Sequence, residues 1–228
     1  MKKYLLILCA VKLFFLESFA AEASLGSFES QASAVYIIDA GHGGADGGAV
    51  GIDGVMEKDI NLAISEKTAL LLPLMGLDAV TTRDRDISIH DPGVTGIRNQ
   101  KISDLKNRVN MASGYTNPVY ISVHLNLFPV EKYRGAQVFY STNHPDSKIL
   151  ADVLQNNARV FLDGENKRVP KAAKDVYIME RICCPAVIFE CGFISNPIDA
   201  ALLQTGEYQL KCALAILASC IELSTYES

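Results

Sequence analysis

Three side chains of the kinds used in metal binding and acid–base catalysis follow apolar runs in this chain. His42 lies in the glycine-rich stretch IDAGHGGADGGA, directly after the first of these runs. His124 and Glu190 each follow a further apolar run, far along the sequence. In parallel α/β sheets, ligands bind beyond the carboxyl ends of the strands, where such residues would meet. The sequence therefore predicts that two imidazoles and a carboxylate gather at one edge of a sheet.

Two neutral imidazoles and a carboxylate suit a catalytic zinc ion that keeps one position open for water. We expect Glu57, in the segment GVMEKD at the start of a predicted helix, to be the third ligand. A glutamate near a helix start is also favoured by the helix dipole alone, so Asp39 and Asp46 remain alternatives. Glu190 would then stay free of the metal and act as general base, because burial raises the pKa of a carboxyl group toward a useful value.

Other candidate residues have simpler interpretations. The glycine run lacks the spacings of phosphate-binding loops. His90 and His144 lie in loop or turn segments and are interpreted as surface residues. Arg108 fits a solvated helix position as well as a functional one. Cys191 alternates to the strand face opposite Glu190, so we expect it to pack in the core rather than act as a nucleophile.

The rest of the sequence predicts a frame that could position these residues. Apolar runs typical of strands alternate with segments of helical periodicity from residue 35 onward. This alternation favours an α/β fold with three layers, in which a twisted, mostly parallel sheet of about six strands is flanked by helices on both faces. The long loop at 83–100 is expected to form one wall of a substrate groove. The expected strands are 35–40, 78–82, 119–123, 136–140, 176–179 and 186–189, and the expected helices are 58–72, 101–113, 147–162 and 207–223.

Composition and the N-terminal sequence narrow the class of protein. The chain has 228 residues, of which 49% are hydrophobic, enough for the core of one domain. A net charge of -5 and the lack of a basic patch argue against nucleic-acid binding. Residues 1–23 predict a secretory signal peptide, followed by a linker at 24–34 and a catalytic domain at 35–224. The protein is thus expected to be exported, with membrane contact only through the signal or an uncleaved anchor.

Five motifs, in order, resemble the zinc-dependent N-acetylmuramoyl-L-alanine amidases of the type 3 family. They are DAGHGGADGGAVG, EKDINLAI, TTRDRD, YISVHLN and PAVIFECGFISNP. The resemblance implies that His42, Glu57 and His124 bind zinc and that Glu190 is catalytic. It also implies a hydrolase that acts on peptidoglycan, cleaving the amide between the lactyl group of N-acetylmuramic acid and the L-alanine of the stem peptide.

The layout and the segment KRVPKAAKDVYIM look most like the spore-cortex, CwlD-like branch of that family. In that branch, stem removal precedes muramic-lactam formation, which implies a location between the forespore membranes. The link between His124 and Gly135 is too short for the inhibitory helix of some division amidases, so any control is expected from timing, location or a partner protein. Two alternatives stay open: a zinc peptidase or carboxypeptidase acting on cell-wall peptides, and a non-catalytic wall-binding protein.

Overall fold

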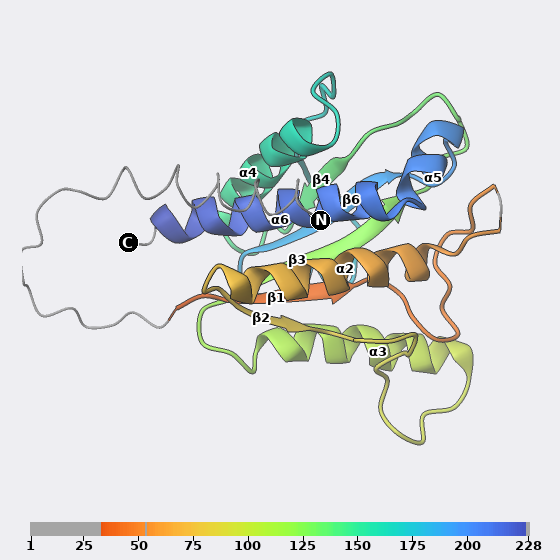
Figure 1. Cartoon of the computed structure of the whole chain (residues 1–228). Coiled ribbons are helices and arrows are strands. Elements are labelled where there is room, and N and C mark those ends of the chain that lie inside the picture. The colour runs from red at the N-terminus through yellow and green to blue at the C-terminus, as the bar shows by residue number, and fades with distance from the viewer. Residues whose placement is uncertain (1–32, 53, 227–228) are drawn as a thin grey trace, which may run out of the picture. The chain divides into compact units, whose positions relative to one another are not determined.

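Six strands form one sheet in the order β2-β1-β3-β6-β4-β5 (Figure 1). The computed structural model describes residues 33–52 and 54–226, so the predicted signal peptide and most of the predicted linker lie outside the described residues. Neighbouring strands are parallel, except that β4 and β6 are antiparallel. The strands are β1 Val35–Ala40, β2 Asp78–Thr81, β3 Pro118–Asn126, β4 Gln137–Tyr140, β5 Lys171–Ala172 and β6 Ala186–Phe193.

Helices cover both faces of this sheet (Figure 1). Successive residues of a strand point to opposite faces, so Ile38 and Phe189 pack with α2, α4 and α6, whereas Ile37 and Ile188 pack on the side of α3. These two hydrophobic clusters confirm the predicted three-layer α/β fold. None of the described helices is both long and apolar enough to span a membrane. The helices are α2 Glu57–Leu74, α3 Ile97–Ala112, α4 Asp146–Phe161, α5 Pro197–Leu203 and α6 Gly206–Tyr226.

The predicted strand at 176–179 is wrong. This segment belongs to a run of turns in which the Glu180 amide donates to the Val176 carbonyl and the Ile182 amide donates to the Ile178 carbonyl. Ile178 and Ile182 are buried in the core on the side of α3. Residues four apart lie on the same side of a helical turn, so one turn buries both. The apolar residues of this segment therefore belong to a helical turn and not to a strand. The short strand β5 takes the edge of the sheet instead.

Two strands extend further than the sequence indicated. β3 continues to Asn126 and β6 to Phe193, so His124 and Glu190 lie within strands rather than beyond their ends. The two residues are direct neighbours across the β3–β6 ladder, and its register shifts immediately after them, between His124 and Asn126. The helix α5 was not expected; the Asn196 side chain caps its first turn by accepting from two backbone amides.

Candidate metal centre

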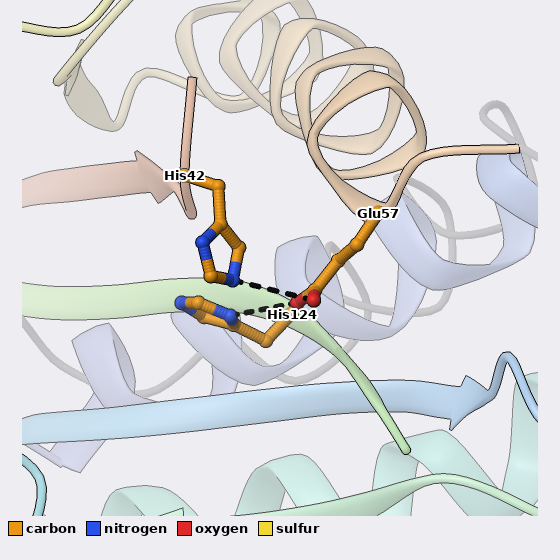
Figure 2. Close-up of side chains that lie close together, drawn as sticks. All are labelled: His42, Glu57 and His124. Carbon is orange, nitrogen blue, oxygen red and sulfur yellow. Dashed lines mark hydrogen bonds and ion pairs between the residues drawn. The ribbon is translucent and has the colours of Figure 1, made fainter. Parts of the chain in front are cut away.

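His42, Glu57 and His124 meet at the carboxyl edge of the sheet, and we call these three residues the ligand cluster (Figure 2). His42 follows β1, Glu57 is the first residue of α2, and His124 lies on β3. Their potential ligand atoms all lie within 4.8 Å of one another. The Glu57 carboxylate is 3.2 Å from His42 Nε2 and 2.9 Å from His124 Nδ1. Nitrogen and oxygen donors that converge from three elements fit the donor set of a catalytic zinc site.

The Glu57 carboxylate is held by the surrounding backbone as well as by the two histidines. It accepts from the amides of Ala49, at 2.8 Å, and Leu125, at 3.0 Å, and from the Asn61 side chain at 3.3 Å. Burial alone would raise the pKa of Glu57, but the hydrogen bonds from His124 and His42 hold it well below its ordinary value. The carboxylate is therefore a fixed negative charge, which is what a cation requires of its ligand.

Glycines in the run after β1 make room for the ligand cluster. A Cβ atom at Gly41 would lie 2.3 Å from His124 Nε2, and one at Gly48 would lie 2.6 Å from the Glu57 carboxylate. Neither position could carry a side chain without displacing a member of the cluster. The glycines therefore let the backbone of this run approach the three side chains closely, and the run does not cradle a phosphate.

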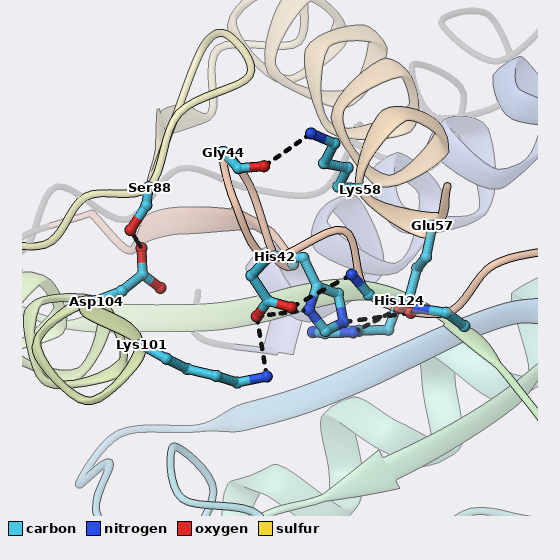
Figure 3. Close-up of polar contacts among 12 residues, drawn as sticks. His42, Gly44, Glu57, Lys58, Ser88, Lys101, Asp104 and His124 are labelled. Atoms are coloured by element: carbon cyan, nitrogen blue, oxygen red, sulfur yellow. Dashed lines mark hydrogen bonds and ion pairs between the residues drawn. The ribbon is translucent and has the colours of Figure 1, made fainter. Parts of the chain in front are cut away.

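A second layer of polar contacts orients His42 (Figure 3). Asp46 lies 3.0 Å from His42 Nδ1, and Lys101 Nζ lies 3.0 Å from the same Asp46 carboxylate. Burial alone would lower the pKa of His42, but hydrogen bonds to Asp46 and Glu57 raise it to about 9. A metal-binding histidine commonly donates its other ring nitrogen to a carboxylate. Asp46, an alternative ligand in the sequence analysis, is thus placed behind His42 rather than in the cluster.

Beneath His42 lies a buried ionic network centred on Arg108. The Arg108 side chain is 2% exposed, which excludes the solvated helix position and leaves the functional one of the two interpretations. It forms an ion pair with Asp39, donates to Asp104 at 2.6 Å, and donates to the His42 carbonyl at 2.7 Å. Burial alone would raise the pKa of Asp39, but Arg108 and the Ser122 hydroxyl lower it to about 2. Asp39 therefore supports the His42 loop and is not in the ligand cluster.

The amino-acid sequence carries one signal of this network. Asp104 and Arg108 are four residues apart, which places an acid and a base on the same face of a helix. Arg83, within the quoted motif TTRDRD, has a related role that the sequence analysis did not assign. Its guanidinium donates to the carbonyls of Ala40, Gly41 and Lys58 at 2.8–3.1 Å. Two arginine side chains, Arg83 and Arg108, thus hold the backbone of the glycine run by hydrogen bonds to its carbonyls.

The loop after β2 packs against the glycine run. It is shorter than expected, because α3 begins at Ile97. Asp86 accepts from Lys58 Nζ at 2.7 Å and from the Gly44 amide at 2.8 Å, and Lys58 Nζ also donates to the Gly44 carbonyl at 2.8 Å. Ser88 reaches Asp104 on α3 at 2.9 Å (Figure 3). The loop is therefore anchored next to the ligand cluster, and its role as a wall of the substrate groove stays a prediction.

Glu190 stands beside the ligand cluster on the neighbouring strand. Its Oε2 atom is buried and has no hydrogen-bond partner among the described residues. Burial raises the pKa of Glu190 to about 7, against the opposing effect of the nearby histidines. The residue lines a cavity of about 560 Å³. A carboxyl group with one free oxygen and a pKa near neutrality can accept and return a proton at the edge of that cavity.

The other residues considered from sequence lie elsewhere. His90 Nδ1 is 2.9 Å from the Ser88 hydroxyl, and His144 lies in a turn beside Asp146; neither belongs to the ligand cluster. Cys191 is completely buried in the core on the side of α2 and α6, and burial raises the pKa of its thiol well above the ordinary value. Packing is thus the role that the structure gives Cys191, as expected.

Comparisons with known proteins agree on one family. Residues 37–222 match the family described as N-acetylmuramoyl-L-alanine amidase, Amidase_3. A germination-specific N-acetylmuramoyl-L-alanine amidase from Bacillus subtilis is 34% identical over 182 residues, which cover 80% of this chain and 76% of the relative.

Solved structures are similar along nearly the same length. The CwlD amidase from Clostridioides difficile, solved in complex with the GerS lipoprotein, is 36% identical with a TM-score of 0.80. The match covers 86% of this chain and 100% of that one. The amidase AmiC2 of Nostoc punctiforme is 28% identical with a TM-score of 0.68, covering 84% of this chain and 96% of the other.

Proposed function

The chain belongs to the Amidase_3 family of N-acetylmuramoyl-L-alanine amidases, and on this premise we propose that it works with a zinc ion held by His42, Glu57 and His124. The enzyme is an amidase that hydrolyses the bond between the lactyl group of N-acetylmuramic acid and the L-alanine of the stem peptide. Family membership favours this activity over the peptidase and wall-binding alternatives.

The observation that supports the zinc proposal is the convergence of the ligand cluster beside Glu190, whose buried Oε2 atom has no hydrogen-bond partner among the described residues. A zinc ion there would supply Lewis acidity, which polarises a carbonyl and makes water nucleophilic at neutral pH. Glu190 takes a proton from the attacking water as the oxygen adds to the lactyl carbon. When the carbon–nitrogen bond breaks, Glu190 returns this proton to the departing alanine nitrogen. A pKa of about 7 suits a group that must both accept and donate at neutral pH.

Metal content and product analysis on intact peptidoglycan test this assignment. We expect His124→Ala to lose zinc and activity together, whereas Glu190→Gln keeps zinc and releases stem peptides roughly 10²- to 10⁴-fold more slowly. His144→Ala removes a histidine that lies outside the ligand cluster and serves as the control, with zinc and activity unchanged. Full zinc content in His124→Ala, or unchanged activity in Glu190→Gln, would contradict the proposed roles.

We also propose that the chain is exported and acts in cortex maturation, upstream of muramic-lactam formation. The pattern of residues 1–23 and the similarity to a germination-specific relative support this proposal. The lipoprotein bound to the CwlD amidase supports regulation of this chain by a partner protein as well. Muropeptide analysis of cortex from a strain lacking the protein is the test: loss of muramic lactam supports the cortex role, and unchanged lactam contradicts it.

A further inference from the structure

The cavity beside Glu190 has a cationic far wall. Its lining runs from Asn126 and Glu190 across β4 to Lys171 and Lys174, on and just after β5. Among the described residues that line it, Glu190 is the one acidic residue. The cavity therefore begins at the candidate catalytic carboxylate and ends at two ammonium groups.

These two lysines are available to a ligand. They belong to the segment KRVPKAAK at 167–174, which carries four positive charges and no acidic residue in a chain of net charge -5. Both are exposed, and within the part of the chain that the structure describes neither side chain has an ion pair or hydrogen bond. Arg168 differs, because its guanidinium lies 4.6 Å from the Phe193 ring centroid and donates to Gln137 at 3.2 Å. Lys171 and Lys174 are thus not needed to hold this segment in place.

Strand pairing places Lys171 on the same sheet face as Glu190. Ile188 pairs with Phe139, and Phe139 pairs with Lys171, so these three form a row across β6, β4 and β5. Glu190 lies two residues along β6 from that row and therefore points to the same side. Two strand spacings of about 4.8 Å and two residues of about 3.3 Å separate the Cα atoms of Lys171 and Glu190 by about 12 Å.

The position of Glu190 also sets the direction of a bound substrate, an argument that rests on the proposed function. β6 lies between β3, which carries His124, and β4. Because Glu190 gives its proton to the alanine nitrogen, that nitrogen lies on the β6 side of the ligand cluster. A stem peptide that continues away from the cluster on this side passes over β4. Two extended residues span about 7 Å, so the second stem residue arrives within reach of a flexible lysine side chain at β5.

That second residue offers a group that lysines recognise. In peptidoglycan stems it is a D-glutamate joined through its γ-carboxyl, so its α-carboxylate is free unless it has been amidated. We propose that Lys171 and Lys174 form a subsite for this free α-carboxylate. The enzyme then distinguishes stems that carry D-glutamate from those that carry D-isoglutamine, through charge-assisted contacts that only the former can make.

Two soluble muropeptides that differ only in this amidation test the subsite, with the zinc-loaded full chain as enzyme. We expect kcat/KM to favour the D-glutamate form by about five-fold, the upper end of the range for an exposed ion pair. The double variant K171Q/K174Q should lose this preference while cleaving the D-isoglutamine form within about two-fold of the original rate. Lys167→Gln removes the same charge from the same segment but faces another cavity, so it should keep the preference.

The outcomes separate the two proposals. Equal cleavage of both muropeptides by the unaltered enzyme, or a preference that survives in K171Q/K174Q, overturns the subsite and leaves the amidase intact. Failure of the zinc-loaded enzyme to cleave either muropeptide overturns the proposed function and the subsite with it. A preference lost equally in Lys167→Gln also counts against the subsite, because it would reflect the general charge of the segment.

Discussion

Replacing Arg108 by lysine tests whether the buried network beneath His42 holds this candidate ligand in place. The guanidinium donates to two carboxylates and to the His42 carbonyl from three different nitrogens. Lysine keeps the positive charge but presents it at one point, so it cannot reach all three acceptors. His42 has a φ of 63°, a left-handed conformation that a non-glycine residue adopts only when its surroundings hold it there.

The expected loss follows from the bonds that lysine cannot replace. If the ammonium stays with Asp39, the charge-assisted bond to Asp104 and the bond to the His42 carbonyl are lost. Such bonds contribute about 1.5–3 and about 0.5–1.5 kcal/mol, so R108K should lower the free energy of unfolding by about 3 kcal/mol. Release of the His42 backbone should also weaken zinc binding by roughly ten- to hundred-fold, the effect typical of removing support from a metal ligand.

Urea unfolding followed by circular dichroism measures the first effect, and competition with a chromophoric chelator measures the second. Arg181→Lys is the matched control, because the Arg181 side chain is 48% exposed and its polar and ring contacts among the described residues are with Tyr177 and Glu180 in its own turn. We expect this control to change stability by less than about 1 kcal/mol and zinc affinity not at all. If R108K behaves like Arg181→Lys in both assays, the network does not position His42.

Two further predictions concern the glycine run and the pH dependence of stability. Gly41→Ala should displace the His124 imidazole and weaken zinc binding at least about ten-fold in the chelator assay. Gly164→Ala, where a Cβ atom would meet none of the described atoms within 4 Å, should leave zinc affinity unchanged, and equal affinities of the two variants would contradict the steric argument. Because the pKa of Asp39 is lowered from 3.8 to about 2, its contribution to stability is complete above pH 4 and is lost as the pH falls toward 2. This loss amounts to about 2 kcal/mol and should be absent in Asp39→Asn. Urea unfolding between pH 5 and pH 2 measures it, and the prediction is contradicted if the variant keeps the same pH dependence of stability.

Local sequence features were sufficient to predict much of the α/β fold. The apolar runs that became β1, β3 and β6 are continuous because these strands are buried on both faces, and such runs are visible without knowledge of their neighbours. The ligand cluster was likewise predictable, because few side chain types bind zinc and each of the three lies in or next to a recognisable apolar run or predicted helix. The resemblance to a known family pointed to the same residues.

The tertiary structure decided which charged residues are buried and which remain free. From sequence, Arg108 fitted a solvated position in a polar helix as well as a functional one, but β1 brings Asp39 against it and makes it part of the core. Lys171 and Lys174 belong to a segment that the sequence marked only as a family motif, and β5 places them at the end of the cavity that begins at Glu190. In each case the environment of a charge is set by segments distant in sequence, and the cost of burying a charge depends on those partners alone.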